Sequence, residues 1–338
     1  MIFEPVFFEK NRVGRVYTGG KLFSSFFSDD STDGFFPEEW IASAIEANNK
    51  EKVREREGVS RVLGSGEYFD ELLKKYPEEM LGKAGKLRIL VKILDSAVRL
   101  PAQAHPDKAF SRKHFNSEYG KTESWIVLDK RPDAKIYFGF KDGVDKDMLN
   151  KAIDDSETDK AAMEALMEYR EPEIGDVILV PAKTVHAIGA GCLILEVQEP
   201  TDFTIQPERW CDSYKLSDYE MYIGLERETA VEVFDFSKAP EAKLSPKVTE
   251  EGEGVNKEQL IGRENTDCFV INRITLNDGS CVIDNKNGYG VYIVTEGEGK
   301  ILGDGYSKDI KKGDYFFMPA CCMGEFSVNG NVSLVECY

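Results

Sequence analysis

LPAQAHPDKAFSRKHFNSEYGKTESWIVL, residues 100–128, joins two short apolar stretches that carry polar side chains at regular positions. Gln103 and His105 are two residues apart, so on a strand their side chains point to the same face. Glu123 begins the second apolar stretch, about one hairpin later. This spacing predicts two neighbouring strands that present an amide, an imidazole and a carboxylate to the interior of one barrel.

A further polar candidate lies far downstream, in GDVILVPAKTVHAIGAG, residues 175–191, which contains His186. One amide oxygen, two imidazoles and a carboxylate form a ligand set that suits a divalent metal of the zinc type. A lone histidine is more often a surface or core residue than a ligand, and His114, in the charged segment FSRKHFNSEYG, is interpreted in that way. The sequence therefore makes His105 and His186 the histidine ligands.

Short apolar runs separated by turns occupy most of the chain after Gly85. Such runs, at this spacing, are typical of an all-β sandwich or barrel. The fold class we expect is mainly β, with helical insertions. The runs are LRILVKIL, VRLPAQAH, SWIVLD, AKIYFGF, DVILVPA and CLILEVQE, and later CFVINRITL, GVYIVTEGEGKIL, DYFFMPA and SLVECY.

Helical spacing of apolar residues interrupts the strands in three segments, at about 66–82, 145–170 and 213–234. The stretch 238–258 is polar, acidic and proline-containing, and predicts a linker. We therefore expect a catalytic unit at 1–237, a linker at 238–258 and a second β unit at 259–338.

The segment PEEWIASAIEANNKE, residues 37–51, fits two structures. Pro37 followed by two glutamates is typical of a helix start. Trp40, Ala42 and Ala44, however, alternate as they would on a strand. Local propensity alone favours the helix.

The two β units share a signature. A Gly-Asp pair at Gly175 leads through four apolar residues to Pro181, and His186 follows five residues later. A second Gly-Asp pair leads through four apolar residues to Pro319, and Gly324 follows at the same distance. Gly-Asp turns into strands are common, but the flanking match favours a duplicated barrel. Only the first copy retains the ligand.

Composition limits the partners of this 338-residue chain, whose formal charge is −18. Nucleic acid and anionic membranes need a basic face, so neither is expected as a partner. The N-terminal residues show no signal pattern, and no apolar run approaches the roughly 20 residues of a membrane span. The 7 cysteines have no framework spacing, which indicates free thiols and a cytoplasmic location. Oligomeric state is not readable from the sequence.

QAHPDK, YGKTESW and VPAKTVHAIGAG with LEVQE together resemble the zinc-site motifs of the type I phosphomannose isomerases (mannose-6-phosphate isomerases) of the cupin superfamily. The resemblance covers most of residues 1 to about 225. It implies two cupin-type barrels (jelly rolls), the second without metal ligands, and places residues 37–51 on a strand. The zinc ligands that it implies are Gln103, His105, Glu123 and His186.

The resemblance also implies an activity: a Zn²⁺-dependent interconversion of mannose 6-phosphate and fructose 6-phosphate through an enediol. A metal that polarises both sugar oxygens stabilises the developing oxyanion, and an acid/base then moves a proton between carbons 1 and 2. Lys121 and Glu196 are the candidates for that role. A glutamate within CLILEVQE is costly unless paired, and the structural alternative is an ion pair with a lysine such as Lys121.

The chain departs from the family around the substrate. Gln206 stands where the family has an arginine that helps to hold the substrate, and Arg209 lies three residues further on. Pro101 replaces a common serine, and Lys183 replaces a glycine. A neutral glutamine cannot replace a guanidinium in charge-assisted binding of an anion. Either Arg209 and Lys183 rebuild the anion site, or the substrate is not the usual sugar phosphate.

Two other hypotheses stay open. The same metal chemistry would serve a free or differently phosphorylated sugar, or the barrel would bind sugar without catalysis. Manganese, iron, cobalt and nickel also suit such a ligand set.

Overall fold

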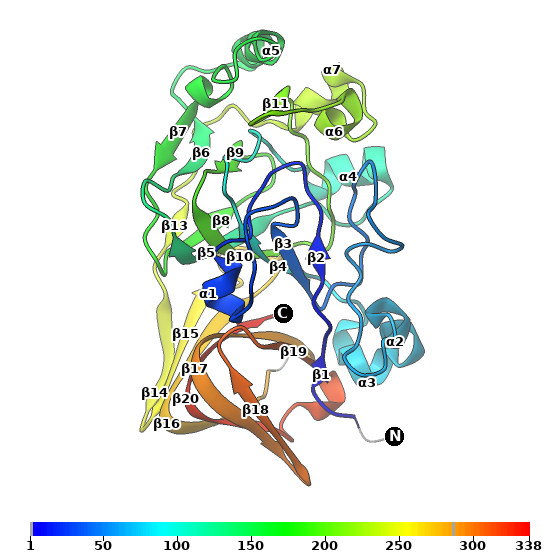
Figure 1. Ribbon diagram of the computed structural model, residues 1–338, viewed down its shortest axis with the longest axis vertical. Coiled ribbons are helices and arrows are strands. Elements are labelled where there is room, and N and C mark those ends of the chain that lie inside the picture. Colours follow the sequence, from blue (N-terminus) through cyan, green and yellow to red (C-terminus); the bar gives the residue numbers. More distant parts are fainter. Residues whose placement is uncertain (1–2, 286–287) are drawn as a thin grey trace.

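The strands gather in two units that lie end to end along the long axis of the molecule (Figure 1). The computed structural model describes residues 3–285 and 288–338. The first unit contains a seven-stranded and a three-stranded sheet, and the second contains an eight-stranded sheet. The mainly β architecture and the cupin-type fold class agree with the expectation from the sequence.

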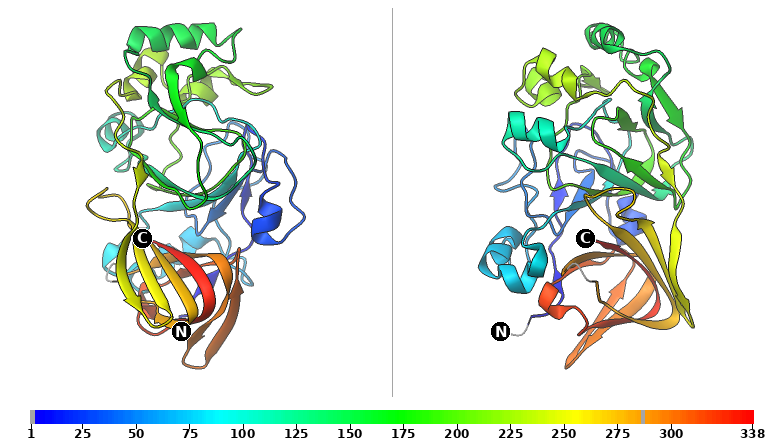
Figure 2. Two further views of the ribbon diagram at one scale, coloured as in Figure 1. Left: turned by 90° about the vertical axis from the view of Figure 1, so that its left-hand side faces the viewer. Right: turned by 180° about the vertical axis from the view of Figure 1, so that it is seen from behind.

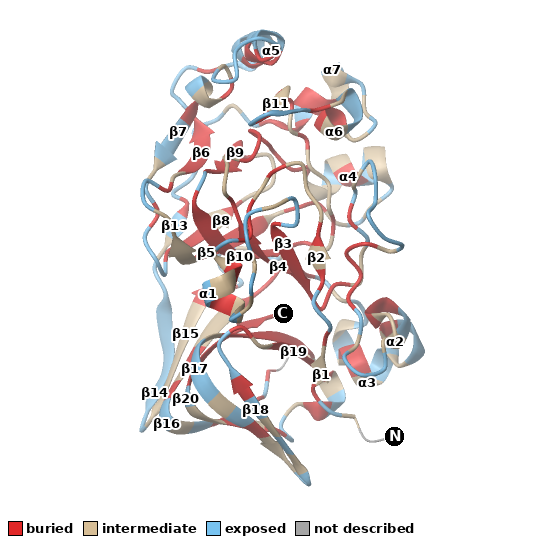
Figure 3. Cartoon of the chain, in the orientation of Figure 1, coloured by how far each residue is buried: buried red, intermediate tan, exposed pale blue. Residues whose placement is uncertain are grey.

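The seven-stranded sheet is antiparallel, in the order β13-β8-β5-β10-β4-β3-β2. Its strands are β2 (Arg12–Val13), β3 (Glu38–Ile41), β4 (Leu90–Asp95), β5 (Glu123–Lys130), β8 (Val177–Val180), β10 (Cys192–Gln198) and β13 (Lys243–Leu244). Every residue of β4 and β10 is buried, which explains why both read as continuous apolar runs (Figure 3).

The two faces of this sheet pack against different cores. Leu94 and Ile194 belong to a core shared with the three-stranded sheet, whose strands are β6 (Ile136–Phe140), β7 (Met167–Arg170) and β9 (His186–Ile188). Ile93 and Leu195 point the other way, into a core shared with the second unit. Because side chains alternate along the strands, one face of the sheet packs beside the site and the other face packs against the second unit.

The strand assignment of residues 37–51 is confirmed only for the first part, β3, which contains Trp40 with a side chain that is 0% exposed. Helices lie in the three segments where they were expected. Pro77, however, divides the first into two short helices, and the last part of the second forms strand β7. The helices are α1 (Phe23–Phe27), α2 (Phe69–Lys75), α3 (Pro77–Leu81), α4 (Lys108–Phe115), α5 (Lys146–Asp155), α6 (Asp218–Tyr222) and α7 (Arg227–Ala230).

The second unit is a curved sheet in the order β1-β19-β17-β20-β16-β15-β14, with β18 beside β17 (Figure 2). The N-terminal strand β1 therefore lies in the second unit, where it pairs with β19. The strands are β1 (Val6–Phe7), β14 (Lys247–Gly252), β15 (Val255–Ile261), β16 (Ile271–Val282), β17 (Gly290–Gly303), β18 (Tyr306–Lys311), β19 (Tyr315–Met318) and β20 (Ser327–Cys337).

The segment expected as a linker, 238–258, instead contains β13, β14 and the start of β15. Strand β14 is exposed at every position and lies at the edge of its sheet. An edge strand open to solvent on both faces carries polar side chains, and so it reads as a loop from composition alone.

The shared signature has a common backbone basis. Gly175 and Gly313 have φ of 91° and 92°, a conformation that favours glycine, and the buried strands β8 and β19 begin two residues later.

All seven cysteines are free thiols. Within the described ranges, no helix is long and apolar enough to cross a membrane.

Candidate active site

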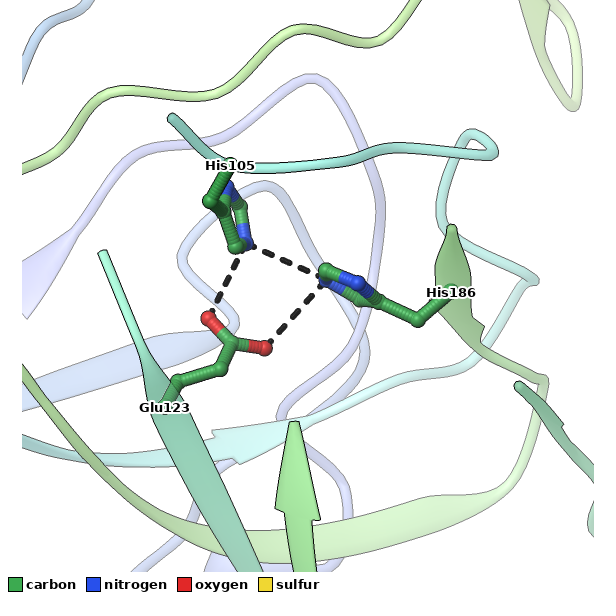
Figure 4. Close-up of side chains that lie close together, drawn as sticks. All are labelled: His105, Glu123 and His186. Atoms are coloured by element: carbon green, nitrogen blue, oxygen red, sulfur yellow. Dashed lines mark hydrogen bonds and ion pairs between the residues drawn. The ribbon is translucent and has the colours of Figure 1, made fainter. Parts of the chain in front are cut away.

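Three buried side chains from separate parts of the first unit converge on one point (Figure 4). His105 precedes α4, Glu123 begins β5 and His186 begins β9. The Nε2 atom of His105 lies 3.0 Å from Oε2 of Glu123, and the Nε2 atom of His186 lies 3.3 Å from Oε1. The two Nε2 atoms are 3.1 Å apart. The structure brings together the two imidazoles and the carboxylate, but the strand expected for Gln103 and His105 is not formed: Gln103 makes an isolated bridge with His186, and His105 lies in no strand.

Main-chain carbonyls fix the protonation of both rings. Nδ1 of His105 lies 3.0 Å from the carbonyl oxygen of Phe203, and Nδ1 of His186 lies 2.8 Å from that of Thr184. A carbonyl accepts only from a protonated nitrogen, so each Nε2 carries a lone pair. Burial, followed by the Lys121 ammonium, lowers the pKa of His105 to about 3, and burial also lowers the pKa of His186. Two neutral imidazoles therefore direct lone pairs at the same point.

These donors fit a divalent cation. Neutral imidazole nitrogens and an ionised carboxylate are the forms in which metals are bound. Burial alone would raise the pKa of Glu123, but Lys121 and the two histidines outweigh it and hold the pKa well below 4.5. Within the described part of the chain, Oε2 of Glu123 is buried without a hydrogen bond of good geometry. A carbonyl held by each opposite ring nitrogen is also the usual support of a metal-binding histidine.

Lys121 and Gln103 lie beside this group. The Nζ atom of Lys121 is 2.9 Å from Nε2 of His105 and 3.0 Å from Oε2 of Glu123. Gln103 pairs through its main chain with His186 and lines the cavity beside the group. Gly120 lets the main chain just before Lys121 lie close to Pro106, because a Cβ at Gly120 would be 2.6 Å from the carbonyl oxygen of Pro106.

A cavity of about 490 Å³ lies beside this group, and its volume is within the usual range of small-molecule sites. Lys121 and Gln103 line it, whereas His105, Glu123 and His186 are no more than 1% exposed and do not. Five charged side chains that line it form a connected group, and only Glu196 among them was expected from the sequence to be a site residue. These side chains, called the wall cluster below, are Arg15, Glu38, Lys92, Glu196 and Asp202.

The wall cluster is a network of ion pairs with side chains no more than 13% exposed. Lys92 Nζ lies 3.2 Å from Glu196 and 3.9 Å from both Glu38 and Asp202. Arg15 lies 3.0 Å from Glu38 and 3.1 Å from Asp202. Burial opposes ionisation, but Arg15 and Lys92 lower the pKa of Glu38 to about 2. Burial raises the pKa of Glu196, and Lys92 offsets only part of that effect.

The structural alternative for Glu196, an ion pair with a lysine such as Lys121, is present in the structure with Lys92 as the partner. The signal for Lys92 was present in the sequence. A lysine within the apolar run LVKILD is as costly to bury as a glutamate within CLILEVQE.

Arg209 and Lys183, the candidates for rebuilding the anion site, do not line the cavity. Arg209 is bound at the surface by Glu157 at 2.6 Å and Asp218 at 3.0 Å. Lys183 lies in a turn with φ of 73°, a conformation that favours the glycine expected there. Gln206 does line the cavity, and its Nε2 donates to the carbonyl oxygen of Glu220 at 2.9 Å.

The fold, the potential His/Glu/His metal site and the charged cavity beside it define the class: a cupin-type protein with a candidate metal site. Curated relatives narrow this class to one family. The chain is 31% identical over 250 residues to a mannose-6-phosphate isomerase of Bacillus subtilis, covering 72% of each. It is 28% identical over 327 residues to that of Streptococcus mutans, covering 94% of this chain and 92% of that one. No protein-family model matches.

The solved structure of the mannose 6-phosphate isomerase from Bacillus subtilis has the same fold. It superposes with a TM-score of 0.80 over 99% of this chain and 100% of that one, at 22% identity. The chain belongs to the mannose-6-phosphate isomerase family, whose members are aldose–ketose isomerases.

Proposed function

We propose that the protein is a zinc-dependent isomerase that interconverts mannose 6-phosphate and fructose 6-phosphate through an enediol. The observation that carries this proposal is the convergence of two Nε2 lone pairs and a carboxylate next to Lys121, which lines a sugar-sized cavity. Zinc would be held by His105, Glu123 and His186, with the amide oxygen of Gln103 as fourth ligand.

Zinc supplies a Lewis acid for the carbonyl oxygen and the neighbouring hydroxyl oxygen of the sugar. The chain supplies the proton carriers, Lys121 and Glu196, which both face the cavity. One base removes the proton from carbon 2, and the proton is returned at carbon 1. Burial raises the pKa of Glu196 above 4.5, which brings that carboxyl closer to the range useful at neutral pH. Lys92 beside it positions the carboxyl and balances its charge.

We assign catalysis to the unit expected at 1–237 and a supporting role to the second unit. Across the described residues, the one group of three metal-type side chains is His105, Glu123 and His186. The free cysteines support a reducing, cytoplasmic setting.

The test is turnover by the zinc-loaded protein. We expect interconversion of the two sugar phosphates, loss on chelation and recovery on adding zinc. The variant His105→Ala should lower kcat/KM by more than about 100-fold, because loss of a ligand exceeds the cost of losing its outer partners. His114→Ala is the matched control, since His114 lies outside the group, and should keep its activity. No turnover by protein shown to contain one zinc per chain would refute the proposal.

A second candidate function is isomerisation of an unphosphorylated sugar. It is favoured by the neutral Gln206 in the cavity and by the absence of Arg209 and Lys183 from its lining residues. Comparing kcat/KM for mannose and mannose 6-phosphate decides between the two. A preference for mannose would select this candidate.

A further inference from the structure

Four cationic side chains line the cavity, and three of them are already neutralised. Arg15 and Lys92 pair with carboxylates of the wall cluster, and Lys121 lies 3.0 Å from Glu123. Lys50 is the fourth. Over residues 3–285 and 288–338, no carboxylate lies within ion-pair distance of its ammonium group, and that group makes no hydrogen bond. An anionic group entering the cavity therefore finds its uncompensated positive charge at Lys50.

The main chain next to Lys50 is held firmly on the cavity wall. The N–H of Asn48 donates to Asp202 at 2.8 Å, and Asn48 Oδ1 accepts from Tyr219 at 3.1 Å. The side chain of Asn49 donates to the carbonyl oxygen of Gly14 at 2.9 Å. These bonds fix where the lysine stem begins, while its exposed ammonium stays free to move toward a ligand.

Glu220 also lines the cavity near Lys50, but the hydrogen bonds of its carboxylate come from other groups. The carboxylate of Glu220 accepts from the main chain and hydroxyl of Ser217 at 2.7 and 2.6 Å, and from Tyr214 at 2.8 Å. Burial raises the pKa of Glu220, but these bonds and the nearby Lys50 outweigh it. Gln206 is bound to the main chain of the same residue, so Lys50 and Gln206 lie at the same end of the cavity.

We propose that Lys50 binds the phosphate of the sugar substrate, at the part of the cavity that Gln206 and Glu220 also line. This inference rests on the proposed function and names the residue that selects a phosphorylated substrate. A phosphate carries about −1.5 to −2 charges at pH 7, and lysine is a point-charge phosphate binder. The chain has a formal charge of −18, so only a local cation can favour a dianion here. Glu51, at the same rim, opposes binding.

The test compares Lys50→Met with Lys52→Met, a control whose ammonium pairs with Glu46 and does not line the cavity. For mannose 6-phosphate, Lys50→Met should raise KM about 10-fold or more with kcat nearly unchanged, because a charge-assisted bond is lost. Turnover of mannose should not change. Glu51→Gln should lower the KM for mannose 6-phosphate. An unchanged KM in Lys50→Met would overturn the inference.

Calorimetric binding of inorganic phosphate gives a readout independent of turnover. Binding by the native protein that is lost in Lys50→Met, and kept in Lys52→Met, supports the inference. Equal binding by both variants, or none by the native protein, overturns it. If phosphate binding depends on Lys50 but no sugar phosphate is isomerised, the proposed function fails and the anion site stands.

Discussion

At the scale of single residues, the site depends on hydrogen-bond partners that lie both near and far in sequence. The carbonyl groups of Phe203 and Thr184 decide which nitrogen of each histidine is free. Glu38 is a second example, because Tyr17 and Trp40 donate to it, both at 2.7 Å, and Arg15 supplies the opposite charge. Such a carboxylate links the charge balance of the cavity to the stability of the fold.

The lowered pKa of Glu38 predicts that the folded protein loses stability in acid. Its pKa falls from 4.5 to about 2 on folding, so its contribution is complete above pH 4.5 and is lost as the pH falls toward 2. Over that interval the linked free energy is about 3 kcal/mol. Glu38→Gln should be less stable than the native protein at pH 6, and the gap should shrink by about that amount by pH 2. Urea unfolding across this pH range measures it, and a constant gap would contradict the assignment.

Arrangements of residues close together in the sequence could be predicted, whereas contacts between distant strands could not. That Gln103 and His105 lie near the same site could be predicted from their two-residue spacing, although their segment forms isolated bridges instead of the expected strand. The pair between Lys92 and Glu196 could not, because the two face each other across strands β4 and β10. Their register depends on how whole strands pair. Arg209 was misplaced for the same reason, since its nearness in sequence to Gln206 did not put it in the cavity.

At the scale of elements, the segment QAHPDK has a structural as well as a chemical role. Its Asp107 is the N-cap of α4 and accepts from the N–H of Phe110 at 2.7 Å. Asn116 closes the helix in the left-handed conformation, with φ of 52°. The helix thus begins directly after the His105 segment and ends before the strand that carries Glu123.

Replacing Asp107 should therefore change stability more than the metal group. Asp107→Ala is expected to cost about 1 kcal/mol of unfolding free energy, and Asp107→Ser should retain most of it, because serine also caps helices. Urea unfolding measures the cost, and zinc content gives the second readout. Loss of zinc in both variants at full stability would show that Asp107 serves the site directly.

Strand β3 shows where local propensity fails. Pro37 and the glutamates after it are typical of a helix start, yet Glu38 and Glu39 are buried acceptors in a strand. Arg12 and Arg15, from a distant segment, pair with them. Tertiary partners therefore outweigh propensity here, as the alternation around Trp40 and the resemblance to a known family indicated.

At the scale of the whole molecule, the two units share one apolar core. Ile93 and Leu195 of the first unit belong to the same cluster as Phe317 and Val335 of the second. The ring of Phe317 lies 5.0 Å from that of Phe69 in α2. The sequence predicted two β units but not this sharing, because β4 and β10 read only as buried strands. A core of this kind makes unfolding of one unit expose the apolar surface of the other.

The shared core predicts a single cooperative unfolding transition. All 3 tryptophans lie in the first unit, so their fluorescence reports on that unit, whereas far-ultraviolet circular dichroism reports on both. We expect the two signals to coincide in urea. Phe317→Ala, which empties a fully buried site in the second unit, should shift the tryptophan transition by about 3–5 kcal/mol. Val282→Ala, at a position 54% exposed in the same unit, should shift it by less than about 0.5 kcal/mol. A tryptophan transition that stays in place when Phe317→Ala lowers the dichroism midpoint would show that the units unfold independently.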